Sequence, residues 1–357
     1  MAPILATGQL IGNRYEVWEQ LKHYKDLYKC FDTKHDNKEL ILKVEQIKDR
    51  NRLETEFELY KKLSTAHHFD IVVDYLSDKS FRYLLMRPLG VNLHDFMKKK
   101  RSKNQTIDLE LIVRYADEMI SRLTNCHLRN IIHRDIKPEN FVVDTDNDSH
   151  LYLIDFNLAK EFADVSGGHI VNRRKGIAYS VGNVQFMSIH AHDGNEQSRR
   201  DDLISVGYTL VYLANDGLPW SQIRSNMFST RLDHMKAVHK IKQNCSVDEL
   251  CVGLPEAFRQ YMNYCLNLEF DERPNYFQLR KYFSDSLPKI NSLSVMCPVI
   301  PPSQPTVITL DSLSLDDLKV VTKEPEDNSM DSKHKFVKTR AHIMLKISKL
   351  SPPLIGP

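Results

Sequence analysis

Several features that mark common protein classes are missing from this chain of 357 residues. Acidic and basic side chains nearly cancel, at 47 and 49, so the formal charge of +2 provides no overall basic field for nucleic acid or membrane. The six cysteines include no Cys-x-x-Cys pair, which excludes the common zinc spacings and gives no disulfide framework. No apolar run approaches the roughly 18 residues of a membrane span. We therefore expect a reducing compartment, no membrane span and no nucleic-acid partner.

Proline is scarce in most of the chain and crowded at its end. Nine of the 15 prolines follow residue 287, a composition typical of a tail. We expect an N-terminal lead over residues 1–14, one folded domain over 15–287, and a Pro-rich, mostly disordered tail over 288–357. The first residues, Met-Ala-Pro-Ile-Leu-Ala, lack the basic segment of a signal peptide, so the expected location is the cytoplasm, the nucleus or both.

The hydrophobic pattern changes character along the folded domain. Short apolar runs rich in strand-forming residues occur at 40–44, 71–73 and 83–86. Between the first two runs, apolar side chains recur at helical spacing over 53–63, and a second, longer helical stripe covers 109–123. The sequence therefore predicts a small, mainly β part followed by a larger, mainly α part.

The strongest motif lies near the middle of the chain. Residues 132–140 read Ile-His-Arg-Asp-Ile-Lys-Pro-Glu-Asn, and an apolar strand at 151–154 leads into Asp-Phe-Asn at 155–157. This pair of motifs resembles the catalytic loop and metal-binding turn of protein kinases. Residues 195–203 read Asn-Glu-Gln-Ser-Arg-Arg-Asp-Asp-Leu, and Leu-Pro-Trp follows at 218–220. Both are similar to the casein kinase 1 family.

The resemblance covers roughly residues 11–287. It implies an α+β fold, the bilobal protein kinase fold, with a small β-rich N-lobe over 15–87 and a larger α-helical C-lobe over 92–287. ATP and Mg²⁺ would lie in the cleft between the lobes. The implied reaction transfers the γ-phosphoryl group to Ser or Thr of protein substrates, acidic or previously phosphorylated proteins among them. The resemblance is to a monomeric enzyme of signal transduction.

The resemblance also implies catalytic and metal-binding residues. Asp135 would orient the substrate hydroxyl and accept its proton, and Lys137 would contact the γ-phosphate. Asn140 and Asp155 would bind Mg²⁺, since both offer hard oxygen ligands. These charges suit phosphoryl transfer, in which the protein mainly positions the reactants and neutralises phosphate charge.

A second set of implied residues would bind the nucleotide. Lys43 would contact the α- and β-phosphates, and Glu56 on the following helix would be its ion-pair partner. Met86 would guard the back of the adenine pocket, with Leu89 in the hinge beside it. Asp202 would have a structural role, holding the catalytic loop in place.

Glycine is missing from the whole stretch between Gly12 and Gly90. An active kinase normally covers the phosphates with a Gly-x-Gly-x-x-Gly turn, because only backbone without side chains comes close enough to donate its N–H groups. The corresponding residues, 21–28, read Leu-Lys-His-Tyr-Lys-Asp-Leu-Tyr. Two interpretations stay open: the two lysines and one histidine of this stretch form a substitute clamp over the phosphates, or the clamp is lost. We expect weakened nucleotide binding.

Two further departures affect the metal turn and the activation segment. Asn157 replaces the glycine that ends the metal turn, and we expect the turn to survive because Asn tolerates positive φ. In the activation segment, Asn183 replaces a Thr that ties the loop to the catalytic aspartate, and Gln185 replaces an Arg that binds acidic or phosphorylated substrates. Basic residues that would retain part of this anion site are Arg134, Lys160, Arg231 and those at 173–175.

Two functions remain open at this point. All six charged or amide groups expected to contact ATP, metal or hydroxyl are present, which favours an active Ser/Thr kinase. Loss of the glycine turn favours a pseudokinase, a kinase-shaped scaffold with weak or no turnover. Removal of a positioning element lowers rate and affinity without ending the chemistry, so we favour the active enzyme.

Overall fold

The structure is a computed structural model that describes most of the folded domain. The described residues are 3–22, 24–49, 51–66, 68–103, 108–145, 147–163, 168–173, 176 and 180–287. The predicted tail, 288–357, lies outside the described residues. The domain boundaries expected from the sequence therefore stay predictions.

An antiparallel sheet forms the N-lobe. Its strands follow the order β1-β2-β3-β4-β6-β5, with bounds β1 Leu10–Ile11, β2 Tyr15–Gln20, β3 Leu27–Asp32, β4 Lys38–Gln46, β5 Val72–Ser77 and β6 Phe81–Met86. Burial alternates along β3 and β4, as expected for strands with one face on a core. That core includes Tyr28, Cys30, Leu40 and Leu42. Because side chains alternate, Lys43 points to the other face of β4.

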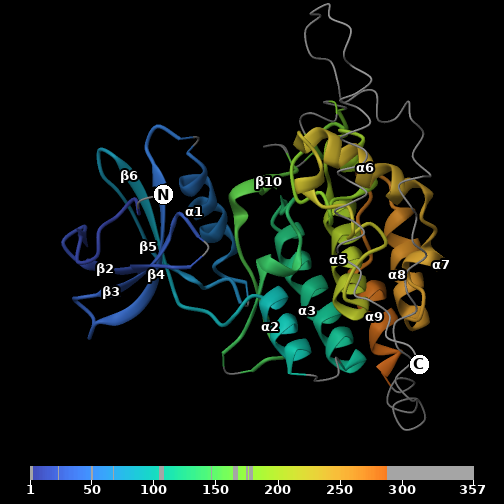
Figure 1. Ribbon diagram of the computed structural model, residues 1–357, viewed down its shortest axis with the longest axis horizontal. Coiled ribbons are helices and arrows are strands. Elements are labelled where there is room, and N and C mark those ends of the chain that lie inside the picture. Colours follow the sequence, from blue (N-terminus) through green and yellow to red (C-terminus); the bar gives the residue numbers. More distant parts are fainter. Residues whose placement is uncertain are drawn as a thin grey trace, which may run out of the picture. The chain divides into compact units, whose positions relative to one another are not determined.

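One helix accompanies this sheet. Helix α1, Arg52–Leu63, lies between β4 and β5 in the chain and beside the sheet in space (Figure 1). It contacts β4, β5 and β6. Its buried residues include Glu56, an unusual residue for a packed face, since a buried carboxylate needs a partner. Helix α1 therefore places the Glu56 carboxylate in the protein interior.

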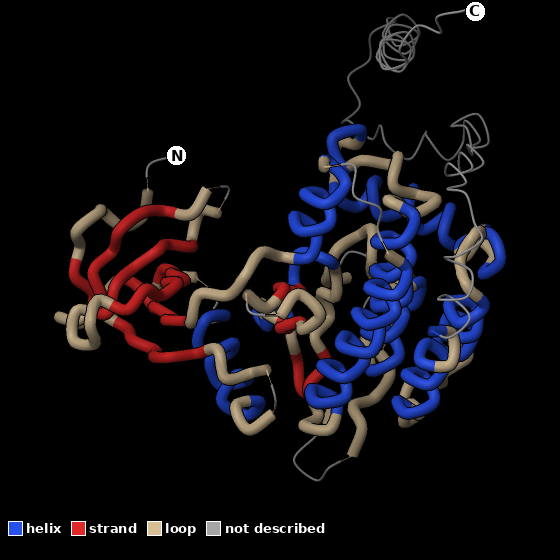
Figure 2. The backbone as a smooth tube through the Cα atoms, turned by 90° about the horizontal axis from the view of Figure 1, so that it is seen from below, coloured by secondary structure: helices blue, strands red, loops and turns tan. Residues whose placement is uncertain are grey.

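The C-lobe is mainly helical (Figure 2). Its helices are α2 Leu93–Ser102, α3 Leu109–His127, α4 Ile189–His192, α5 Arg199–Asn215, α6 Arg231–Asn244, α7 Val247–Leu250, α8 Glu256–Leu266 and α9 Tyr276–Ser284. Two short hairpin-like pairs accompany them: β8 Phe141–Val143 with β9 Leu151–Leu153, and β7 Ile131–Ile132 with β10 Lys160–Glu161. The predicted α+β fold, with a β-rich N-lobe before a larger α-helical C-lobe, is confirmed.

Helix α5 is the centre of the C-lobe. Thirteen of its residues are buried, including Asp201 and Asp202 in the first turn. It packs against α3 and α8, while α3 also packs against α9. A helix buried on all sides provides a rigid support for loops that rest on its N-terminus. Within the described part of the chain, no helix is both long and apolar enough to cross a membrane.

The hinge between the lobes rests directly on β8. A Cβ atom on Gly90 would lie 2.1 Å from the carbonyl oxygen of Val143. The neighbouring backbone is fixed by a hydrogen bond of 2.9 Å from the Val143 N–H to the Val91 carbonyl. Glycine is therefore required here by the close approach of two backbones.

Substitution of this glycine tests the contact. We expect Gly90→Ala to lower the free energy of unfolding by about 1–3 kcal/mol, because the clash is with backbone that cannot rotate away. Urea denaturation measures the change. Gly217→Ala is the matched control, since its Cβ would meet only Ser221 at 3.7 Å. Equal stability of the two variants would contradict this account of the hinge.

Candidate active site

Lys43 joins the two lobes through two carboxylates. Its Nζ donates to Glu56 Oε2 at 2.8 Å and to Asp155 Oδ1 at 2.7 Å. The Glu56 side chain is only 1% exposed, so it is held as a buried partner of the ammonium. Burial alone would lower the pKa of Lys43, but attraction to Glu56 and Asp155 outweighs it, and the pKa is raised. The lysine therefore stays charged where phosphate would bind.

Helix α1 also holds the metal turn. Glu56 Oε1 accepts a hydrogen bond of 3.2 Å from the Phe156 N–H, and the Tyr60 hydroxyl accepts one of 3.2 Å from the Asp155 N–H. The Phe156 ring packs edge-on against Tyr60 and His133, with centroids 5.0 and 4.8 Å away. One continuous set of contacts therefore links α1 to the catalytic loop.

Asp155 itself has the left-handed backbone conformation, with φ 69° and ψ 67°. Asn157 lies in the following 3₁₀ turn, Phe156–Leu158, and is not among the residues with positive φ. The expectation that Asn157 would need its tolerance of positive φ was therefore wrong: Asp155 adopts that conformation. The turn survives the loss of its glycine because the strained position lies two residues earlier.

The catalytic loop brings three predicted residues together. Lys137 Nζ lies 2.5 Å from Asp135 Oδ2. The Asn140 amide donates to the Asp135 carbonyl at 2.8 Å and to Oδ2 at 3.1 Å. Because the NH₂ group of Asn140 points at Asp135, its amide oxygen is available as a ligand. Asp135 is 7% exposed, so little of its side chain meets solvent.

Asp202 supports this loop from the N-terminal turn of α5. Its carboxylate accepts from the N–H groups of His133 and Arg134 at 2.7 and 2.8 Å, and pairs with His127 Nε2 at 3.1 Å. Burial alone would raise the pKa of Asp202, but the hydrogen bond from His127 and the neighbouring donors hold it below its usual value. The structure thus places Asp202 where the sequence predicted a supporting residue.

A short turn stands where a glycine-rich loop would cover the phosphates. The Leu21 N–H donates to the Leu27 carbonyl at 2.9 Å, and the Tyr24 N–H donates back to the Leu21 carbonyl at 3.2 Å. Lys22 and Lys25 are exposed, whereas His23 lies outside the described residues. Two backbone donors of this turn therefore serve the turn itself instead of facing a ligand.

The region that the family resemblance assigns to adenine contains a residue that sequence reasoning missed. Met86 and Leu89 are both half-buried at the end of β6 and in the hinge. Ile41 pairs with Met86 across β4 and β6, and it shares the strand face of Lys43. The kinase motif Val-Ala-Ile-Lys has alanine at this position. Comparison of position 41, two residues before Lys43, with the alanine of this motif would have identified the larger side chain.

Two side chains of the activation segment make hydrogen bonds within the C-lobe. Asn183 Oδ1 accepts from the Gln185 N–H at 2.9 Å, a local turn, and no bond to Asp135 is present among the described residues. Gln185 points into the C-lobe, where its amide donates to the Ile223 carbonyl at 3.0 Å. Among the described residues, the Asn183 amide therefore does not take over the tie to the catalytic aspartate that the replaced Thr makes in the family.

Three of the basic residues expected to form an anion site have internal partners, whereas Arg173 is exposed. Arg134 Nε donates to the Leu158 carbonyl at 2.7 Å, and Lys160 pairs with Glu196 at 3.2 Å. Arg231 donates to the backbone carbonyls of residues 180 and 182 at 3.1 and 2.9 Å. The basic pair at 174–175 lies outside the described residues. These charges stabilise the activation segment from within instead of standing open to a ligand.

The donor set fits ATP with Mg²⁺. Asp155 supplies a carboxylate and Asn140 an amide oxygen, the hard ligands that Mg²⁺ prefers. Burial would raise the pKa of Asp155, but Lys43 lowers it, so the carboxylate is ionised and able to bind a cation. Lys43 and Lys137 supply positive charge on two sides of the same region, as a triphosphate requires.

Comparison with known families identifies a domain that covers most of the chain. The protein kinase domain matches residues 24–283, which is more than half of the chain. The match includes Lys43, Glu56, the catalytic loop and the metal turn. Members of this family use ATP and Mg²⁺ and phosphorylate proteins. The chain therefore belongs to the protein kinase domain family, and this membership implies ATP and Mg²⁺ as cofactors and proteins as substrates.

Proposed function

We propose that this protein is an active Ser/Thr kinase of casein kinase 1 type, working in the cytoplasm, the nucleus or both. One observation carries the proposal: Lys43 contacts Glu56 and Asp155 at once, at 2.8 and 2.7 Å. This contact joins the N-lobe to the metal turn in a single charged array. Phosphoryl transfer requires that such charges are already in position before any substrate binds.

The proposed mechanism uses each residue for one task. Bound Mg²⁺ would neutralise charge on the β- and γ-phosphates. Lys43 and Lys137 hold the phosphates by charge, and Asp135 orients a substrate hydroxyl and accepts its proton. The hydroxyl oxygen forms a bond to the γ-phosphorus while the bond from that phosphorus to the β–γ bridging oxygen breaks. ADP leaves, and the proton remains on the Asp135 carboxylate.

The casein kinase 1 type rests on the run at residues 195–203. In the structure this run joins the activation segment to α5: the Gln197 amide donates to the Val181 carbonyl at 3.0 Å. Arg200 donates to the Leu268 carbonyl at 3.0 Å, beyond α8. Ser198 and Asp201 form a capping box at the start of α5. Each of these polar residues thus has a structural task at the junction of the activation segment and α5.

Analysis of the phosphorylated amino acid tests the proposal. Full-length protein is incubated with casein and radiolabelled ATP·Mg²⁺, and the labelled casein is hydrolysed. We expect label in phosphoserine or phosphothreonine, and its loss in an Asp155→Asn variant, which weakens metal binding. Label in phosphotyrosine would contradict the Ser/Thr assignment. Equal label with the Asp155→Asn variant would contradict the proposed site.

The pseudokinase alternative is favoured by two specific observations. The turn after β2 uses its own amides internally, and Ile41 places a larger side chain beside Met86 than the alanine of the kinase motif. Both would weaken nucleotide binding without altering the charged array. The two functions therefore differ in turnover at high ATP concentration, because weak binding is overcome by concentration whereas a missing catalytic group is not.

The side chain at position 41 gives a direct prediction for nucleotide affinity. We expect Ile41→Ala to lower the KM for ATP by roughly tenfold, because a few methyl groups in a tight pocket change binding by about that factor. Steady-state kinetics, or calorimetry with a non-hydrolysable analogue, measures the effect. Ile47→Ala is a control for the same change at an exposed site after β4. An unchanged or higher KM would show that Ile41 does not restrict the pocket.

A further inference from the structure

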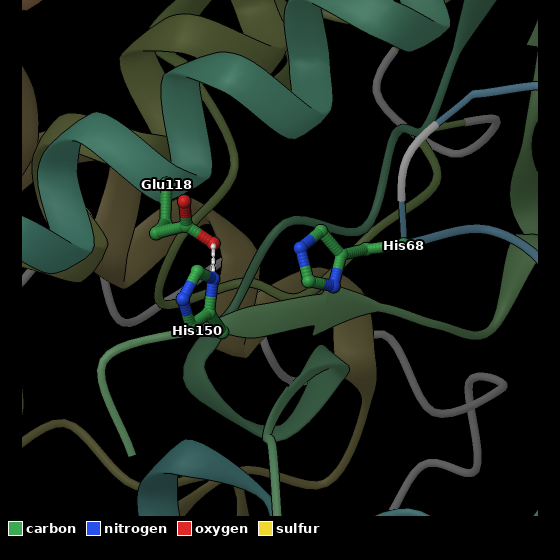
Figure 3. A group of neighbouring side chains, drawn as sticks. All are labelled: His68, Glu118 and His150. Atoms are coloured by element: carbon green, nitrogen blue, oxygen red, sulfur yellow. Dashed lines mark ion pairs between the residues drawn. The ribbon is translucent and has the colours of Figure 1, made fainter. Parts of the chain in front are cut away.

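Three side chains that could bind a metal ion lie close together, and none of them belongs to the catalytic array (Figure 3). His68 lies in the segment between α1 and β5, in the N-lobe. Glu118 lies on α3 and His150 just before β9, both in the C-lobe. One ligand atom from each residue lies within 4.8 Å of the others. Side chains from both lobes therefore converge on one small region.

The two C-lobe ligands are held in position by their surroundings. Glu118 Oε2 accepts a hydrogen bond of 3.1 Å from the Leu151 N–H and a further one from Arg122. The backbone N–H of His150 donates to the Asn147 carbonyl at 3.0 Å, which fixes the turn before β9. Ligands anchored in this way lose little freedom when an ion binds.

The histidine rings are stacked beside the hinge. The rings of His68 and His150 lie 5.3 Å apart with an interplanar angle of 25°. Tyr152 lies edge-on to His68 at 5.0 Å, and the guanidinium of the hinge residue Arg87 lies 5.8 Å from the Tyr152 ring. The cluster is therefore separated from the hinge by one aromatic side chain.

The spacing inside the cluster leaves one polar atom without a hydrogen bond to any described residue. His150 Nδ1 is shielded from solvent and has no hydrogen-bond partner among the described residues. It faces Glu118 Oε2 at 3.8 Å, which is too long for a hydrogen bond (Figure 3). Two ligands of a tetrahedral zinc ion lie about 3.4 Å apart, given bond lengths of about 2.0–2.1 Å. This pair is about 0.4 Å too far apart for a shared ion, and the three ligand atoms, which lie within 4.8 Å of one another, must move closer by side-chain rotation when an ion binds.

We propose that His68, Glu118 and His150 bind a divalent cation of the zinc class, which ties the N-lobe to the C-lobe beside the hinge. Two imidazoles and one carboxylate match Zn²⁺, whereas Mg²⁺ prefers an all-oxygen shell. Three protein ligands leave one position for water or for a group from a partner. The site is independent of the proposed phosphoryl transfer, because it shares no residue with the catalytic array.

Metal titration of the full-length protein tests the site. The protein is treated with a chelator, dialysed, and titrated with Co²⁺ and then with Zn²⁺ in the absence of ATP. We expect one equivalent of Co²⁺ to give the visible absorption bands of a tetrahedral ion, and Zn²⁺ to displace it. The same equivalent of Zn²⁺ is expected to raise the melting temperature by several degrees, since it binds only the folded chain.

Variants assign the ligands. We expect His150→Ala, Glu118→Gln and His68→Asn each to weaken Zn²⁺ binding about tenfold or more. Asn at position 68 preserves the left-handed backbone of that residue, whose φ is 65°. His35→Ala removes an exposed imidazole elsewhere and is expected to bind like wild type. Circular dichroism of the metal-free proteins shows that each variant is folded.

Three results would overturn the proposal. The first is weak binding of several equivalents, as for adventitious ions on surface histidines. The second is tight binding that all three variants retain. The third, measured on the wild-type protein and so independent of any variant's folding, is a zinc X-ray absorption spectrum that shows sulfur ligands instead of two imidazoles with oxygen.

Discussion

Asp135→Asn lowers the kcat for protein phosphorylation by about 10²–10⁴-fold in this account, the usual contribution of a general base. The substitution keeps the shape of the side chain and leaves the backbone carbonyl that accepts from Asn140 in place. The KM for ATP should therefore change little, because Asp135 meets the substrate hydroxyl and not the nucleotide. Initial rates at saturating casein, with ATP varied, separate the two constants.

A surface substitution controls for nonspecific effects. Asp117 lies on α3 in an exposed ion pair with Arg280, so Asp117→Asn is expected to keep wild-type kinetics. A fall in kcat for Asp135→Asn of less than about tenfold, with both proteins folded, would remove Asp135 from the role of proton acceptor.

Asp202→Ala has the largest expected effect on stability. The change leaves the N–H groups of His133 and Arg134 buried without their acceptor, and each orphaned donor costs about 1–3 kcal/mol. We expect the free energy of unfolding to fall by about 3 kcal/mol or more. Because His133 contacts both Phe156 and the Ile154 carbonyl, activity is expected to fall as well. Urea denaturation followed by circular dichroism measures the loss.

The pH dependence of this effect has a defined sign. The pKa of Asp202 is held below its usual value in the folded protein. Its contribution to the free energy of unfolding is therefore fully present above the unfolded-state pKa, near 3.9. The contribution is lost as pH falls through the folded-state pKa. The stability difference between wild type and Asp202→Ala should thus be larger above the unfolded-state pKa of Asp202 and shrink in acid. The exposed Asp117→Ala change should cost less than about 1 kcal/mol. A loss as small as that control's would contradict the supporting role of Asp202.

Local patterns in the sequence predict much of this fold. A short apolar run at 40–44 and a helical stripe at 109–123 correspond to β4 and α3. The motif at 132–140 also predicts that Asp135, Lys137 and Asn140 lie together, because they are only a few residues apart. The Lys43–Glu56 pair is predictable through the family resemblance, since strand and helix packing bring two distant charges to one point.

Other features depend on packing that no short pattern records. Arg134, Lys160 and Arg231 are basic in the sequence, but only the fold shows that each has an internal partner. The cluster of His68, Glu118 and His150 comes from three distant segments with no metal-binding spacing, so it is visible only in three dimensions. For the turn at 21–26, the sequence shows that glycine is absent. Only the structure shows that backbone amides of this turn donate hydrogen bonds within the turn itself.

Phosphoryl transfer to casein from radiolabelled ATP·Mg²⁺, raised to millimolar ATP, is the most direct test of the central claim. The claim is that an intact charged array sustains catalysis although the glycine-rich turn is absent. We predict label that rises toward millimolar ATP, exceeds that of an Asp135→Asn protein, and is lost in a Lys43→Ala protein. Folded wild-type protein that gives no label above the Asp135→Asn baseline would contradict the claim and make this kinase fold a binding scaffold.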